Sequence, residues 1–131
     1  MTRLVYQLII SVSAVFTVPV LYAHHSVPGQ FDMSLEVEWT GVITKIDWIN
    51  PHTYIYLEIK NEDGTVVTWK LESVPTAMMR KAGLTREMIM GDGGTVTVHG
   101  LVARDRTKHL GFINKITYPD GHFFRFSPSP R

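Results

Sequence analysis

The sequence has no cysteine, which excludes disulfide bonds and thiol chemistry from any account of its stability or function. It also lacks an excess of charge, since 13 basic residues stand against 12 acidic ones in 131 residues. A balanced chain has no electrostatic footprint for nucleic acid or an anionic membrane surface, so we expect neither partner. The sequence contains no nucleophile elbow, P-loop, dinucleotide fingerprint or zinc-protease helix motif. We therefore expect a binding domain rather than an enzyme.

One long apolar stretch is present, and it lies at the amino terminus. Residues 4–21 are almost all apolar or small, and they follow Arg3. A positive start, an apolar stretch and a small residue at Ala23 are the parts of a secretory signal. We therefore predict a signal peptide over residues 1–23 and a periplasmic or secreted domain that is free of the membrane after cleavage. An uncleaved anchor is the alternative, because about 20 apolar residues span a bilayer.

The remaining chain is rich in strand signals and has the length of one domain. Residues 24–33 have no periodicity, so we expect an extended N-terminal lead-in, and residues 127–131 are expected to form a disordered tail. Residues 34–126 are predicted to form the folded domain. Its strands are predicted at residues 35–48, 53–60, 65–72, 95–103, 110–118 and 122–126.

Two local signals divide this run of strands. Asp63-Gly64 predicts a hairpin turn between the second and third strands. Ser73 is predicted to cap a short helix that has Pro75 in its first turn, and a second helical turn is expected from Thr85. We therefore predict a mainly β fold, a small OB-like Greek-key barrel of five to six strands with one short helix between the third and fourth strands. A β-sandwich is the alternative, but the helix counts against it.

Several motifs carry a likeness to a known family. The residues A-H-H-S follow the leader, a strand ends with W-x-N-P-H at residues 48–52, and V-x-x-W-x-L-E follows at residues 66–72. A V-x-V-x-G strand at residues 96–100 and the Pro-Asp-Gly turn at residues 119–121 complete the pattern. The chain resembles the bacterial exported family of domain of unknown function 6152. The resemblance implies a soluble exported domain and no established activity.

The histidines suggest a metal site. Cleavage after Ala23 would make His24 the amino terminus, so that its free amine and its ring nitrogen chelate one ion together. A further nitrogen from His25 or His52 would complete a site suited to copper. We therefore predict a copper-type site at His24, His25 and His52. The alternative is a solvated chain end, with His52 serving only the turn at the end of the first strand.

A second candidate site is a surface at the corner between the first two strands. Trp48, Asn50, Tyr54 and Tyr56 lie at this corner, which borders the binding face in OB-like barrels. Exposed aromatic residues there would hold a small ligand or a periplasmic protein partner. The alternative is that Trp48 belongs to the core and the tyrosines only cover one side of the sheet.

Overall fold

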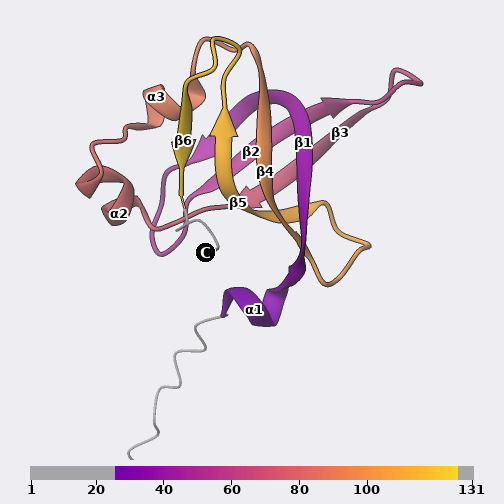
Figure 1. Ribbon diagram of the computed structural model, residues 1–131, viewed down its shortest axis with the longest axis horizontal. Helices are drawn as coiled ribbons and strands as arrows, with labels where there is room; N and C mark the ends of the chain where they lie inside the picture. Colours follow the sequence, from indigo (N-terminus) through magenta and orange to yellow (C-terminus); the bar gives the residue numbers. More distant parts are fainter. Residues whose placement is uncertain (1–25, 127–131) are drawn as a thin grey trace, which may run out of the picture.

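A computed structural model describes residues 26–126 of the chain (Figure 1). The predicted signal peptide and tail, together with His24 and His25, lie outside the described residues. The elements are α1 (Val27–Gln30), β1 (Phe31–Asp47), β2 (Tyr54–Lys60), β3 (Val66–Glu72), α2 (Thr76–Lys81), α3 (Arg86–Met90), β4 (Thr95–Ala103), β5 (Leu110–Thr117) and β6 (Phe123–Arg125).

The strands form one closed barrel with an added strand. Antiparallel pairing runs from β3 through β2, β1 and β4 to β5, and a parallel pairing of β3 with β5 closes the ring. The short β6 extends the sheet beyond β5. Because α2 and α3 connect β3 to β4, the order of strands and helices is that of an OB-like barrel. The predicted fold class is confirmed, with two short helical segments between the third and fourth strands.

The hairpin of β2 and β3 follows from its turn. Asn61 donates its backbone N–H to the Thr65 carbonyl over 2.8 Å, and Gly64 has a φ of 86°, which favours glycine. This turn sets the register in which Lys60 faces Val66 and Tyr54 faces Glu72. The turn chemistry therefore places Glu72 beside the start of β2.

Strand β1 serves two neighbours because it bends. Its first part pairs with β4 and its last part with β2, and the two pairings meet at Val42. Gly41 sits where β2 crosses closely, and an added Cβ there would lie 2.3 Å from the Glu58 carbonyl oxygen. Gly41 thus allows the close approach of two strands.

The barrel interior is filled by alternate residues of the strands. Ile55, Leu57 and Leu71 are fully buried on the inner face of the hairpin. Trp39 is buried as well, and its ring centroid lies 5.0 Å from that of the half-buried Trp69. This main core fixes the strands whose ends carry the candidate site.

The lead-in expected at residues 24–33 differs from the structure within its described part. Residues 27–30 form α1, and β1 begins at Phe31 rather than Leu35. Phe31 is 1% exposed and packs with Phe112, Leu101 and Ala103 in a second, smaller core. Burial of this one aromatic ring anchors a segment whose own sequence has no periodicity.

The predicted helix cap was also misplaced. Helix α2 begins at Thr76 after Pro75, and the Ser73 side chain does not cap it. Ser73 instead continues the sheet, since its backbone N–H donates to the Thr53 carbonyl over 2.9 Å. The second helical turn formed as predicted, because the Thr85 side chain accepts from the Met88 backbone N–H and caps α3.

Candidate functional site

His52 is held in place by a buried carboxylate. It follows the cis Asn50-Pro51 bond, and its Nδ1 lies 2.8 Å from Oε1 of Glu72. The Glu72 side chain is only 10% exposed, whereas the His52 side chain is 33% exposed. A carboxylate can only accept, so the ring donates from Nδ1, and in the neutral ring Nε2 carries the free lone pair. The pair therefore fixes both the orientation and the tautomer of a partly exposed imidazole.

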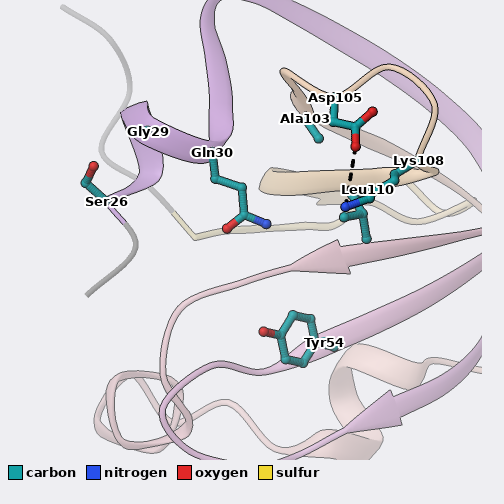
Figure 2. Close-up of a pocket in the computed structure, with 8 residues that line it drawn as sticks. All are labelled: Ser26, Gly29, Gln30, Tyr54, Ala103, Asp105, Lys108 and Leu110. Carbon is teal, nitrogen blue, oxygen red and sulfur yellow. Dashed lines mark ion pairs between the residues drawn. The ribbon is translucent and has the colours of Figure 1, made fainter. Parts of the chain in front are cut away.

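A pocket of about 630 Å³ lies beside the start of β2. Figure 2 shows Tyr54 on one side and, opposite it, residues of α1 and of the loop that joins β4 to β5. The position is notable because this loop and the β1–β2 loop border the binding site of OB-folds. The pocket is lined by Ser26, Gly29, Gln30, Tyr54, Ala103, Asp105, Lys108 and Leu110.

The outer face of β2 carries two tyrosines with a cation over each ring. The Lys70 ammonium lies 4.0 Å from the Tyr54 ring centroid, and the Lys45 ammonium lies 4.7 Å from that of Tyr56. The Tyr56 hydroxyl donates to Asp47 over 2.8 Å. Partial burial raises the pKa of Tyr54, and the charge of nearby Glu72 raises it further. Both phenols are therefore neutral at physiological pH and available as hydrogen-bonding groups.

The other two residues of the predicted corner serve internal contacts. Trp48 is half-buried and packs against the main core. The Asn50 side-chain oxygen accepts from the Thr76 hydroxyl over 2.6 Å, which links the β1–β2 loop to α2. Of the four corner residues, Tyr54 alone reaches the pocket.

The predicted metal ligands are only partly described. His24 and His25 lie outside the described residues, but Ser26, which follows them in the chain, lines the pocket. Within residues 26–126, no three histidine, aspartate or glutamate side chains come together as a metal-binding group.

A second histidine–carboxylate pair lies in the turn between β5 and β6. The His122 Nδ1 lies 2.5 Å from Oδ1 of Asp120, and the His122 ring stacks on Tyr118 with the centroids 4.2 Å apart. A smaller pocket of about 250 Å³ adjoins these residues. Burial raises the pKa of Tyr118 to about 12, and its hydroxyl donates to the Ile89 carbonyl over 2.6 Å. This turn provides an internal comparison for the His52 site.

Comparison with known families identifies the chain. A model described as a family of unknown function, domain of unknown function 6152, matches residues 12–112. The chain belongs to this family. The match includes His52, Glu72 and every residue that lines the larger pocket, whereas the turn at residues 118–122 lies beyond it. The family resemblance seen in the sequence is confirmed.

The other comparisons add no relative. Neither the curated proteins nor the solved structures yield a match. Among residues 26–126, no helix is both long enough and apolar enough to pass through a bilayer.

Several residues of the site were not predicted from the sequence, among them Glu72, Asp105 and Lys108. Asp105 and Lys108 come from a loop without a recognisable motif, so their approach to Tyr54 depends on how the barrel closes. Glu72 could have been found, because the Asp63-Gly64 turn sets the hairpin register that pairs it with Tyr54. His52 lies two positions before Tyr54, so the same register brings it close to the end of β3, where its ring contacts Glu72.

Proposed function

We propose that the chain is an exported binding domain that holds a copper-type metal ion between its mature amino terminus and His52. His24 would bind through its terminal amine and its ring, and His25 or His52 would supply the next nitrogen. The periplasm, or the exterior of the cell, is where such a terminus would be created by signal cleavage. The observation that carries the proposal is the contact between His52 and Glu72.

This contact has the form found behind metal-binding histidines. A histidine that ligates a metal through one ring nitrogen almost always donates the other N–H to a carboxylate, a carbonyl or water. Glu72 is buried and lies 2.8 Å from Nδ1, which leaves Nε2 of His52 as the ligating atom. Because the Glu72 carboxylate is buried, water competes little with the His52 ring for hydrogen bonds to it. The ring is therefore oriented before any ion binds.

The first described residue, Ser26, lies at the larger pocket. Ser26 and Tyr54 both line it, and each lies two positions after a proposed ligand, His24 and His52 respectively. Two residues of extended chain reach at most about 7 Å. His24 would thus lie within about 7 Å of Ser26, and the proposal requires it to share one ion with His52.

The ligand chemistry favours copper. Imidazole nitrogens suit copper, and copper forms the strongest complexes among the first-row divalent metals. An α-amino group with a pKa of about 7.7–8.0 loses its proton to a metal near neutral pH. These two properties make an amino-terminal histidine a strong chelating group without any cysteine.

The first test is whether the signal peptide is removed directly before His24. The intact mass of the exported protein should correspond to a chain that begins at His24. Copper(II) titration of that protein, followed by calorimetry and electron paramagnetic resonance, should show one tight site. We expect His24→Ala and His52→Ala each to weaken binding at least about tenfold, because each removes a nitrogen ligand. One glycine added before His24 should weaken binding to a similar degree, since it separates the amine from the ring.

His122→Ala is the matched control, because this histidine is also held by a carboxylate but lies in the β5–β6 turn. It should bind copper like the unchanged protein. Equal affinity in all variants would refute the proposed site.

The aromatic corner supports a second candidate less well. A protein-binding surface would present Trp48, Asn50, Tyr54 and Tyr56 together. Trp48 and Asn50 make internal contacts instead. What remains of this candidate is Tyr54 and the pocket it lines.

A further inference from the structure

Hydrogen bonds and an ion pair hold α1 and the β4–β5 loop together on one side of the larger pocket. The Arg104 side chain donates through Nε to the Pro28 carbonyl over 3.1 Å, and its backbone N–H donates to the Gln30 carbonyl over 2.9 Å. An ion pair of Arg106 with Asp32 adds a third link, with a distance of 2.7 Å. These contacts join α1 and the start of β1 to the β4–β5 loop, so the side of the pocket opposite Tyr54 is formed before any ligand binds. Preformed pockets of about 300–1,000 Å³ are typical of small-molecule sites.

The side chains that line the larger pocket include one aromatic ring, two apolar groups and several hydrogen-bonding groups. Leu110 and Ala103 are apolar, and Tyr54 adds a half-exposed aromatic side chain. Gln30 and Ser26 add groups that both donate and accept hydrogen bonds. Lys70 approaches the Tyr54 ring but does not line the pocket, so its ammonium holds the ring without filling the space. A ligand here would need both an apolar face and many hydroxyl or amide groups.

The charges in the pocket cancel each other. Lys108 and Asp105 line the same wall, and the ammonium lies 3.4 Å from the carboxylate (Figure 2). Hydrogen bonds from Thr107 hold the pKa of Asp105 below its usual value, so the carboxylate is ionised together with the lysine. The Asp105 carboxylate repels an anion such as a phosphate that approaches Lys108. A neutral ligand fits these charges better than an anion.

From the aromatic side chain, the hydrogen-bonding groups and the cancelled charge, we infer that the pocket binds a short neutral oligosaccharide. The apolar face of a sugar ring packs against the Tyr54 ring, and its hydroxyls bond to Gln30 and Asp105. The location agrees with this ligand class, because the β4–β5 loop, which lines the pocket, also borders the site at which OB-folds bind oligosaccharides. The inference goes beyond the proposed metal site and does not require a metal.

The test uses metal-free mature protein and three probes: maltotriose, cellotriose and the trimer of N-acetylglucosamine. Binding is followed by ¹⁵N chemical shifts and by calorimetry. At least one probe should shift the amides of Gln30, Tyr54 and Lys108. Tyr54→Ala and Gln30→Ala should each weaken that probe roughly tenfold, which corresponds to the loss of about one good contact. Tyr56→Ala is the matched control, because it removes a tyrosine from the same strand face outside the pocket.

Several results would overturn the inference. One is the absence of shifts with every probe at millimolar concentration, and another is equal binding by Tyr54→Ala, Gln30→Ala and the unchanged protein. Tighter binding of inorganic phosphate than of all three sugars, lost in Lys108→Ala, would replace the sugar with an anion. His24→Ala should bind the sugar normally, so failure of the metal proposal and failure of this inference would be distinguishable.

Discussion

Strand β5 has a histidine–carboxylate pair near each of its ends, and the two pairs are built differently. Near its start, Glu72 of β3 faces Phe112 of β5 and holds His52, which lies before β2. Just after its end, Asp120 holds His122 two positions along the same turn. The Glu72 side chain is 10% exposed and that of Asp120 is 70% exposed. One pair depends on the register of the β2–β3 hairpin, whereas the other needs only a local turn.

This difference in construction distinguishes a candidate functional site from an ordinary turn. A buried carboxylate contributed by another strand is costly unless it is paired, so its presence needs a partner with a defined position. An exposed aspartate that bonds two residues ahead is common wherever a turn forms. Glu72 also pairs in the sheet with Tyr54, which lines the larger pocket. The two ends of β5 therefore predict different responses to mutation.

The largest expected effect concerns the aromatic residue that anchors the pocket end. Phe31→Ala removes a ring that is 1% exposed, and it should lower the free energy of unfolding by roughly 3–5 kcal/mol. Phe123→Ala at the other end removes a ring that is 55% exposed, and it should change that energy by no more than about 0.5 kcal/mol. Urea denaturation of both variants measures the difference. Similar losses in the two variants would contradict the view that α1 is fastened to the barrel by Phe31.

Local sequence signals predicted some of these features, and others depend on contacts between distant residues. The Asp63-Gly64 turn and the alternation in β2 predicted the hairpin, and the hairpin register contains the Tyr54–Glu72 pairing. The burial of Phe31 could not be read locally, because its neighbours Leu101 and Phe112 lie far along the chain. The same holds for the pocket, whose walls meet only when β3 pairs with β5 and closes the barrel. Local signals therefore predicted the strands and one half of the site, and non-local packing supplied the other half.

The second-largest expected effect is on copper affinity, which should depend on the carboxylate of Glu72 and not on that of Asp120. Glu72→Gln keeps the size of the side chain but removes the charge that orients His52, so copper affinity should fall about 10–100-fold. Asp120→Asn makes the same chemical change at His122 and should leave the affinity unchanged. Competition titration with a copper chelator measures both variants. If Glu72→Gln binds copper normally while His52→Ala does not, the buried carboxylate has no positioning role.

The smallest expected effect is the pH dependence of stability that comes from the Asp120–His122 pair in the β5–β6 turn. The backbone N–H of His122 lowers the pKa of Asp120 below its usual value of 3.8, and the His122 ring lowers it further. Because the folded-state pKa lies below the unfolded one, this stabilisation is present above the unfolded value and is lost as the pH falls through the folded value. An NMR titration of the Asp120 carboxyl carbon should therefore give a midpoint below 3.8.

His122→Ala removes the ring but keeps the backbone N–H, which makes the larger contribution to the lowered pKa of Asp120. The midpoint should therefore rise in this variant and still remain below 3.8. A complete return to 3.8 would mean that the ring alone lowers the pKa, and an unchanged midpoint would mean that the ring contributes nothing. A partial rise would show that this pair is mainly a property of the turn backbone, in contrast to the His52–Glu72 pair, which the pairing of β2 with β3 brings together.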